Sequence, residues 1–256
     1  MKIVFLGTGT SVGIPVIGCE CAVCTSADPR NRRLRAGIYV RTASQHVVID
    51  TPPDFRQQVL THRIPRIDAV LFTHSHADHI FGLDDIRRFN TMQDAVIPAY
   101  ASPSSLTDLR RVFNYVRLDR IPGEFRPRID FREIGGPFRI GDLDIEPLEV
   151  EHGPQPTLGF RLQSDGRTFG YVPDCHRMSD ATVARLARVD VMILDALRHI
   201  PHATHLTVAD SVDLLRRIGA RDSYLIHMCH DLEHAETERE LPATLHMSYD
   251  GLVLDW

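Results

Sequence analysis

Residues 66–79, RIDAVLFTHSHADH, join an apolar run to a short segment rich in metal-binding side chains. The apolar part is typical of a buried strand. In the extended chain that follows, His74 and His76 project to the same side. Asp78 and His79 stand where a helix is predicted to begin, and they can reach a neighbouring point. A lone histidine would be read as a solvated loop residue, but these four groups together predict a site for zinc, manganese or iron.

Three further candidate ligands each follow an apolar run at another place in the chain. His152 follows LDIEPLEVE, Asp174 follows RTFGYVP, and His227 follows SYLI. Because side chains at strand ends converge easily on one edge of a sheet, we expect these three to meet the HSHADH segment. Seven donors are enough for two metals. The predicted partition places His74, His76 and His152 on one metal and Asp78, His79 and His227 on the other, with Asp174 bridging them.

A second cluster, GCECAVC, carries three of the five cysteines in the chain. An odd number of cysteines makes a poor disulfide framework, and a tight cluster in a reducing compartment favours metal binding. The thiols stand at Cys19, Cys21 and Cys24. A tetrahedral zinc site needs a fourth ligand. His230, in the segment HMCH, is the first candidate, with Cys229 and His234 as alternatives.

Length and composition are typical of a globular protein of 256 residues, 43% hydrophobic and 25% charged. The formal net charge of -5 argues against a protein that grips a nucleic-acid backbone. No apolar run approaches the length of a membrane span, and the N-terminus MKIVFLGTGTS lacks a signal-peptide cleavage pattern. We therefore expect a cytoplasmic protein without a membrane partner. No linker or internal repeat is visible, which predicts a single domain over residues 1–256.

Strand and helix patterns alternate along the whole chain, which predicts an α/β fold with two sheets inside and helices outside. A polar turn joins residues 37–42 and 46–50 in one predicted hairpin, and Asp-Gly turns mark two more, one near the middle of the chain and one at its end. The predicted strands and hairpins cover residues 2–7, 37–50, 66–73, 128–134, 143–152, 158–174, 190–196, 223–227 and 246–256. The predicted helices cover residues 54–62, 79–90, 104–116 and 204–220.

The segment THSHADH resembles the H-x-H-x-D-H motif of the metallo-β-lactamase superfamily. The later order of histidine, aspartate and histidine is similar to that superfamily from one end of the chain to the other. The resemblance implies an αββα sandwich, with two mixed sheets flanked by helices and two metals at the sheet edge. A related branch, the oxygen-reducing diiron flavoproteins, has glutamate where this chain has His76. That difference favours hydrolysis over redox chemistry.

Within the superfamily, LGTGTSVGIPVIGCECAVC together with HMCH resembles a narrower branch, the bacterial phosphodiesterases that open phosphoribosyl cyclic phosphate in phosphonate breakdown. This resemblance implies a structural zinc ion on Cys19, Cys21, Cys24 and His230. It also implies two active-site metals, Mn²⁺ or Zn²⁺, and a homodimer. Asp78 would then be both a ligand and a catalytic residue. His205 matches the proton-donating histidine of the branch, with His202 as the next candidate.

Other residues near these motifs each allow two interpretations. Asp50 could orient a ligand histidine or form a turn or helix cap. The glycines of GTGTSVG are spaced too widely for a dinucleotide-binding fingerprint, so a tight turn beneath the metal site is expected. Arg198, Arg177 and Arg88 could contact phosphate or remain solvated surface residues.

The expected function is metal-dependent hydrolysis of a small, cyclic phosphodiester such as phosphoribosyl 1,2-cyclic phosphate. Metallo-hydrolases of other substrates are the alternative, namely an RNA 3′-processing endonuclease, a lactonase or a thioesterase. The chain has no added basic arm of the kind that the RNA endonucleases usually carry. A non-catalytic metal-binding module would show gaps among the seven donors, and the sequence has none.

Overall fold

The computed structural model describes residues 1–121 and 123–255. Within these residues, two seven-stranded sheets pack face to face. The first sheet contains β1 (Lys2–Gly7), β2 (Gly37–Arg41), β3 (His46–Ile49), β4 (Ala69–Leu71), β5 (Ile97–Ala101), β6 (Ile129–Glu133) and β14 (Val253–Asp255). The second contains β7 (Phe138–Ile140), β8 (Leu143–His152), β9 (Gln155–Ser164), β10 (Arg167–Val172), β11 (Val191–Asp195), β12 (Asp222–Ile226) and β13 (Leu245–Met247).

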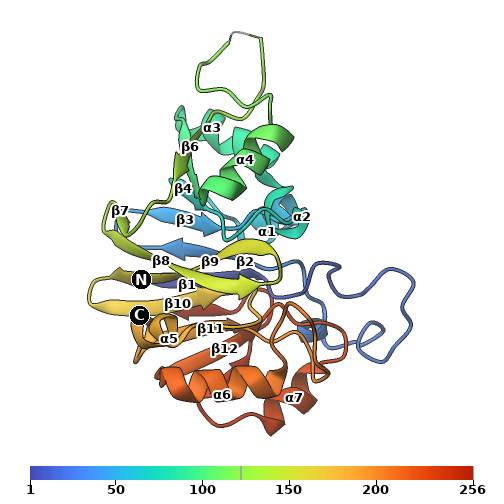
Figure 1. Cartoon of the computed structure of the whole chain (residues 1–256). Coiled ribbons are helices and arrows are strands. Elements are labelled where there is room, and N and C mark those ends of the chain that lie inside the picture. The colour runs from blue at the N-terminus through green and yellow to red at the C-terminus, as the bar shows by residue number, and fades with distance from the viewer. Residues whose placement is uncertain (122, 256) are drawn as a thin grey trace.

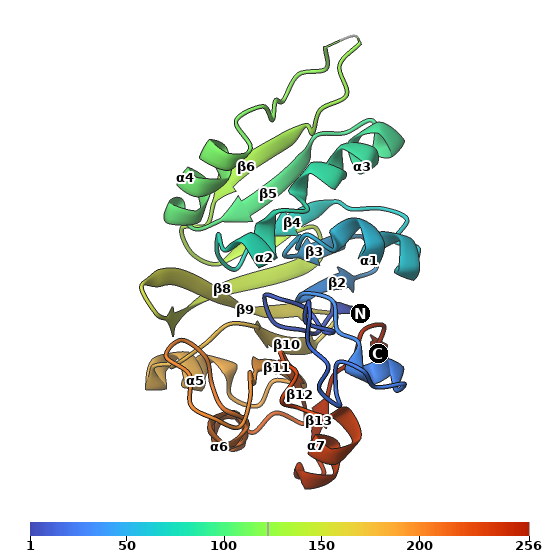
Figure 2. The same cartoon turned by 90° about the vertical axis from the view of Figure 1, so that its right-hand side faces the viewer.

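Helices cover the outer faces of both sheets (Figures 1 and 2). The first sheet carries α1 (Phe55–His62), α2 (Ala77–Ile80), α3 (Ile86–Gln93) and α4 (Pro103–Val112). The second carries α5 (Asp180–Leu186), α6 (Val208–Ile218) and α7 (His234–Glu240). Short 3₁₀ turns occupy Pro29–Asn31 and Leu83–Asp85. Among the described helices, none combines the length and the apolar character needed to cross a membrane. The predicted αββα sandwich is confirmed.

Three apolar cores correspond to the layers. Phe5, Ile38 and Phe160 belong to the core between the sheets. Phe89 belongs to the core beneath the helices of the first sheet, and Leu215 to the core beneath those of the second. Apolar residues therefore face both sides of the central strands, which explains their nearly continuous hydrophobic sequences.

The parallel parts of the sheets determine where the polar strand ends gather. In the first sheet β3, β4, β5 and β6 run parallel in that order, and in the second β10, β11, β12 and β13 do the same. Parallel strands place their carboxyl ends at one edge of a sheet. Asp50 and His74 follow β3 and β4, whereas Asp174 and His227 follow β10 and β12.

Two of the three predicted hairpins are confirmed, and the C-terminal one is wrong. β2 pairs with β3, and β9 pairs with β10, both antiparallel. β13 instead joins β12 in the second sheet, and β14 pairs with β1 in the first. The turn at Asp250–Gly251 thus carries the chain between the sheets. The Asp250 carboxylate fixes this crossing by accepting hydrogen bonds from the Leu34 amide (2.7 Å) and the Thr8 hydroxyl (2.8 Å).

The predicted helix over residues 79–90 is interrupted, and the one over residues 104–116 ends early. A Cβ atom at Gly82 would lie 2.2 Å from the Pro52 carbonyl oxygen, so the chain passes close to another segment there. The turn at Gly82 separates α2 from α3. Helix α4 ends at Val112 because Phe113 leaves the helical region, with φ -105° and ψ 47°.

Candidate metal centre

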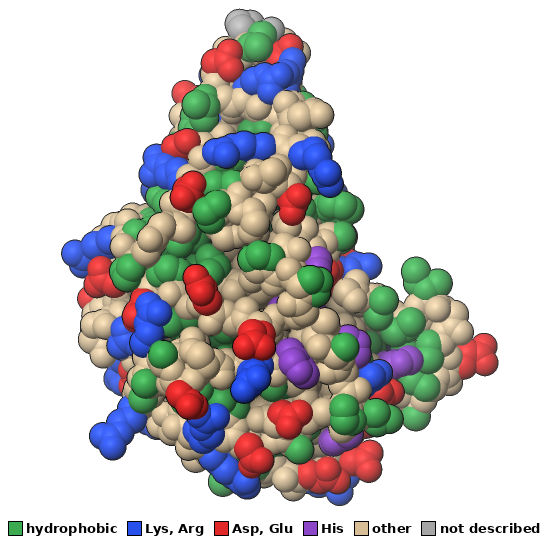
Figure 3. All heavy atoms as spheres, viewed as in Figure 1, with side chains coloured by type: hydrophobic (Ala, Val, Ile, Leu, Met, Phe, Trp, Pro, Cys, Tyr) green, Lys and Arg blue, Asp and Glu red, His purple; other side chains and the backbone are tan. Residues whose placement is uncertain are grey.

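The HSHADH segment forms the turn between β4 and α2. His76 lies directly before α2 in an extended conformation, and its carbonyl accepts the amide of His79 (3.0 Å). His74 is fully buried, whereas His76 is exposed. Asp78 and His79 lie in the first turn of α2, as the sequence predicts. Extended and helical geometry thus place the four side chains around one point. Several histidine side chains are visible on the molecular surface beside the projecting N-terminal loop (Figure 3).

Three histidine nitrogens converge in a first group. The Nδ1 atom of His76 lies 2.9 Å from Nε2 of His74 and 3.4 Å from Nε2 of His152. Two ligand atoms in the tetrahedral shell of one zinc ion are separated by roughly 3.3–3.6 Å. The spacing of these nitrogens therefore suits a shared cation.

A second group forms around Asp78. Its Oδ2 atom lies 3.3 Å from Nε2 of His79 and 3.5 Å from Nε2 of His227. Asp174 lies between the two groups. Its Oδ2 atom is 3.5 Å from His152 and 3.6 Å from His227, and its Oδ1 atom is 3.2 Å from His79. The structure thus brings all seven predicted donors together, in the two predicted groups.

The carboxylates of this cluster give it a negative electrostatic potential. Burial would lower the pKa of His79, but Asp174, Asp78 and Asp50 outweigh it and hold that pKa well above its ordinary value. Burial likewise opposes ionisation of Asp174, but His227 and His79 hold its pKa well below the ordinary range. The carboxylates therefore remain charged and draw positive charge into the cluster.

Several buried atoms of the cluster lack hydrogen-bond partners among the described residues. They are Nε2 of His79, Oδ1 of Asp174 and both ring nitrogens of His227. Unpaired polar atoms in a protein interior are costly and need a reason. Imidazole nitrogens and carboxylate oxygens are the ligands that zinc and manganese take. The residues present therefore fit two divalent cations.

Neighbouring groups orient the donor rings from behind. Asp50 accepts hydrogen bonds from Nδ1 of His79 (2.8 Å) and from the amide and hydroxyl of Thr73 (both 2.9 Å). Of the two readings for Asp50, the structure supports the one in which it orients a histidine. The Thr204 carbonyl accepts Nδ1 of His152 (2.8 Å). Such contacts fix which ring nitrogen faces the metal site.

His205 lies beside the cluster, together with an aspartate that sequence analysis missed. The His205 ring stacks on His227 (centroids 4.7 Å apart, 12° between planes), and its Nδ1 atom lies 2.8 Å from Oδ2 of Asp195. Asp195 ends β11 after the apolar run VMIL, the same signal that identified Asp50 and Asp174. Burial lowers the pKa of His205 to about 4 and raises that of Asp195 well above its ordinary value.

The predicted cysteine cluster also converges. Nδ1 of His230 lies 3.3 Å, 3.7 Å and 3.5 Å from the sulfur atoms of Cys19, Cys21 and Cys24. A sulfur and a nitrogen bound to one tetrahedral zinc ion lie about 3.6 Å apart. The structure groups His230 with the three thiols, whereas Cys229 and His234 fall outside this group. The four residues, called the cysteine site below, fit one zinc ion.

The glycine loop packs closely against the chain that leads into β2. A Cβ atom at Gly7 would lie 2.1 Å from the Arg35 carbonyl oxygen, and one at Gly9 would lie 2.7 Å from that of Arg33. Thr10 donates its amide to the Met228 carbonyl, next to His227 (3.2 Å). The expected tight turn beneath the metal site is thus present.

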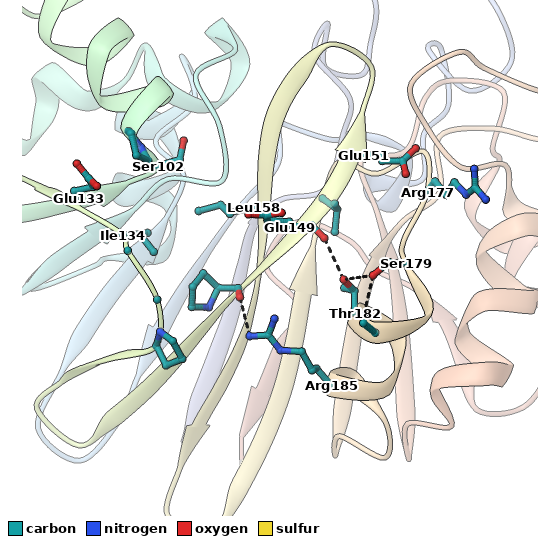
Figure 4. A pocket seen from close by; sticks show the side chains of 17 residues that line it. Ser102, Glu133, Ile134, Glu149, Glu151, Leu158, Arg177, Ser179, Thr182 and Arg185 are labelled. Carbon is teal, nitrogen blue, oxygen red and sulfur yellow. Dashed lines mark hydrogen bonds between the residues drawn. The ribbon is translucent and has the colours of Figure 1, made fainter.

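The three arginines named as possible phosphate contacts lie elsewhere. Arg198 donates to the carbonyls of Ile200 (3.0 Å) and Pro201 (3.2 Å) within its own loop. Arg88 lines a groove between α1 and α3. Arg177 lines a cavity of about 760 Å³ that crosses the β8–β9 hairpin, where Glu149 and Glu151 lie near it (Figure 4). Within the described residues, no hydrogen bond or ion pair joins these arginines to the seven donors.

Comparison with known proteins agrees with this geometry. A family model described as the beta-lactamase superfamily domain matches residues 45–228. The chain belongs to the beta-lactamase superfamily. This chain is similar to the solved structure of a diphosphatase from the PhnP family, with a TM-score of 0.91 and 38% sequence identity. The similarity covers 100% of this chain and 97% of the diphosphatase chain. This neighbour confirms the predicted branch of the superfamily.

Of two other similar proteins, one is much longer than this chain and the other is less similar in sequence. An octanoyltransferase of Porphyromonas gingivalis is 35% identical over 98% of this chain and 51% of its own length, so the chain spans about half of that relative. Zinc-bound PqqB from Methylobacterium extorquens shares the fold, with a TM-score of 0.82 at 21% identity over the whole of both chains. Superfamily membership and the diphosphatase neighbour bear out the expected class, a metal-dependent hydrolase.

Proposed function

We propose that this chain hydrolyses a small, cyclic phosphodiester such as phosphoribosyl 1,2-cyclic phosphate at two divalent cations. The observation that carries the proposal is the convergence of seven donors beside the His205–Asp195 pair. The seven residues, called the His/Asp centre below, are His74, His76, Asp78, His79, His152, Asp174 and His227.

The cations would be Mn²⁺ or Zn²⁺, with one structural Zn²⁺ at the cysteine site. Two divalent cations in the His/Asp centre would supply positive charge for the phosphoryl oxygens and would lower the pKa of bound water toward about 7. Asp174 lies between the two groups, so its carboxylate would help to hold both cations. Asp78 is only partly buried, so its carboxylate can orient the attacking water from the open side of the centre.

His205 is proposed as the general acid. Asp195 holds Nδ1, which leaves Nε2 as the atom that can donate a proton to the leaving alkoxide. Burial disfavours a charged His205–Asp195 pair. In the neutral pair a protonated Asp195 donates to Nδ1, and Nε2 keeps its hydrogen. The ring can therefore donate even though its own pKa is low. Proton donation of this kind is typically worth about 10²–10⁴ in rate.

Hydrolysis of a diphosphate is the second candidate, because the PhnP-family neighbour is a diphosphatase at 38% identity. Both reactions break a bond from phosphorus to a bridging oxygen and need the same charge neutralisation. The net charge of -5 and the absence of an added basic arm weigh against an RNA substrate.

A substrate panel tests the proposal directly. Purified protein reconstituted with Mn²⁺ or with Zn²⁺ is assayed on ribosyl 1,2-cyclic phosphate, on nucleoside diphosphates, on a structured RNA 3′ end, on a lactone and on a thioester. We expect the cyclic phosphodiester to give the highest kcat/KM. Preference for the diphosphates supports the second candidate, and preference for RNA, lactone or thioester contradicts both. Light scattering of the same preparation tests the proposed homodimer.

A further inference from the structure

Arg33 is an arginine whose whole side chain lies inside the protein, with 1% exposure. Its guanidinium donates to the carbonyls of Cys229 (Nη1, 2.9 Å) and Leu232 (Nη2, 2.7 Å), and Nη2 also donates to Oδ1 of Asn31 (3.3 Å). The two carbonyls flank His230 in the turn that follows β12. A planar guanidinium presents its donors in a fixed fork, so it constrains both carbonyls at once.

The backbone of Arg33 is tied to the loop that carries the cysteines. Its amide and carbonyl exchange hydrogen bonds with Ile14 (2.9 Å and 2.8 Å). The neighbouring Asn31 side chain donates to Glu233 (2.6 Å) and accepts the amide of His234 (2.8 Å). The cysteine loop and the turn after β12 are therefore joined by hydrogen bonds of the protein itself, without any metal.

This turn serves both metal sites. His227 belongs to the His/Asp centre, and His230, three residues later, belongs to the cysteine site. The backbone at His227 is left-handed, with φ 62°, a conformation that a histidine holds only when its surroundings impose it. Hydrogen bonds between Met228 and Thr8 (3.0 Å) fix one side of the turn, and Arg33 fixes the other.

We propose that Arg33 is a positioning residue that holds the turn from His227 to Leu232, so that His227 keeps its place in the His/Asp centre even when the cysteine site is empty. Arg33 and a metal at the cysteine site are then two braces on the same turn. Either one suffices to keep His227 oriented, and loss of both releases it. This inference rests on the proposed function only in assuming that the His/Asp centre binds divalent cations.

A double-mutant cycle in the full chain tests the idea, with Co²⁺ alone as the probe. The variants are Arg33→Met, Cys21→Ser and the two combined. Absorption from thiolate-to-cobalt charge transfer reports the cysteine site, and the d–d bands of nitrogen and oxygen ligation report the His/Asp centre. Loss of one orienting partner typically lowers metal affinity by about 10–100-fold. We expect each single substitution to cost about 10-fold or less at the His/Asp centre, and the pair to cost more than the product of the two.

Arg32→Met is the matched control, because Arg32 is the adjacent arginine and is exposed. It should leave both cobalt affinities unchanged. If Arg33→Met does not fold, Arg33→Lys replaces it in the cycle, since lysine keeps the charge but lacks the fork. A residue that only supports the fold would lower the melting temperature without enlarging the cost of Cys21→Ser to the cobalt affinity of the His/Asp centre.

The outcomes separate the two proposals. If the cost at the His/Asp centre in the combined variant is only the product of the two single costs, the role of Arg33 is overturned and the proposed function stands. If the His/Asp centre of the unaltered protein binds no cobalt, both proposals fall. Failure to cleave any phosphodiester affects only the proposed function, because no substrate enters this experiment.

Discussion

Two buried aspartates each hold one histidine ring of the metal centre from behind. Asp50 accepts Nδ1 of His79, and Asp195 contacts Nδ1 of His205, both at 2.8 Å. His79 is directed at the seven-donor cluster, whereas His205 stacks on the edge of it. The same kind of aspartate–histidine contact therefore orients a metal ligand, His79, in one place and, by our proposal, the proton donor His205 in the other. Substitutions that separate metal content from turnover distinguish the two uses.

His205→Ala should keep both metals at the His/Asp centre and lose most turnover, by about 10²-fold or more. The reason is that the donor groups formed around His76 and Asp78 are complete without His205, although the His205 ring lies close to the donors His152 and Asp174. Metal content by elemental analysis and kcat on the best substrate of the panel are the measurements. Loss of metal in this variant would make His205 a ligand and contradict its role as general acid.

Asp195→Asn should also leave the metals in place and lower kcat by roughly 10²-fold, because the amide can no longer give its proton to Nδ1 of His205. Asp213→Asn is the control, since Asp213 is an exposed residue of α6 whose ion pair is with Arg216. An unchanged kcat in Asp195→Asn, with full metal content, would remove Asp195 from the mechanism.

The donors of the centre could be predicted because they carry local signals: four lie together in HSHADH, and His152, Asp174 and His227 each follow an apolar run. Asp195 carries that signal too, but its meaning depends on His205, ten residues further along, and only the folded loop brings the two together. The positions of Arg177 and Arg88 could not be predicted for the same reason. The orientation of an arginine side chain, in the loop after β10 for Arg177 and in α3 for Arg88, depends on neighbours that are distant in sequence.

At the scale of elements, local patterns predicted most strands, missed β5, and failed where two sheets compete for one segment. The run after Asp250 alternates like a hairpin strand, yet β14 pairs with β1 while β13 stays with β12. The partly buried Asp250 carboxylate, bonded to Thr8 and Leu34, decides this crossing, and no local pattern reports such contacts. Helices α5 and α7 were missed because each spans only seven residues.

Gly7→Ala tests the close packing at the end of β1. The new Cβ atom would lie 2.1 Å from the Arg35 carbonyl oxygen, so the backbone must shift, at a cost of about 1–3 kcal/mol in the free energy of unfolding. Gly135→Ala is the matched control, because a Cβ atom there meets nothing within 4 Å. Urea titration of both variants measures the difference, and equal midpoints would contradict the tight packing.

At the scale of the whole molecule, the metal centre joins the two sheets. His74 and His79 follow the first sheet, and His152, Asp174 and His227 follow the second. Bound cations would therefore contribute to the stability of the sandwich as well as to its chemistry. The prediction of a single domain over residues 1–256 requires that both sheets unfold in one cooperative transition.

Removal of the metals should lower the melting temperature without abolishing the sheets, because the three apolar cores do not depend on metal ligands. A ligand present at 100 times its Kd stabilises the folded state by about 2.7 kcal/mol, which for a chain of this length corresponds to roughly 5–10 °C. Calorimetry with and without a chelator measures the shift, and far-ultraviolet circular dichroism checks that the strands persist. Return of Zn²⁺ or Mn²⁺ in excess of the chelator should restore the original midpoint. An identical midpoint in all three conditions would mean that the seven donors hold no cation, and two separate transitions would mean that the sheets belong to different folding units.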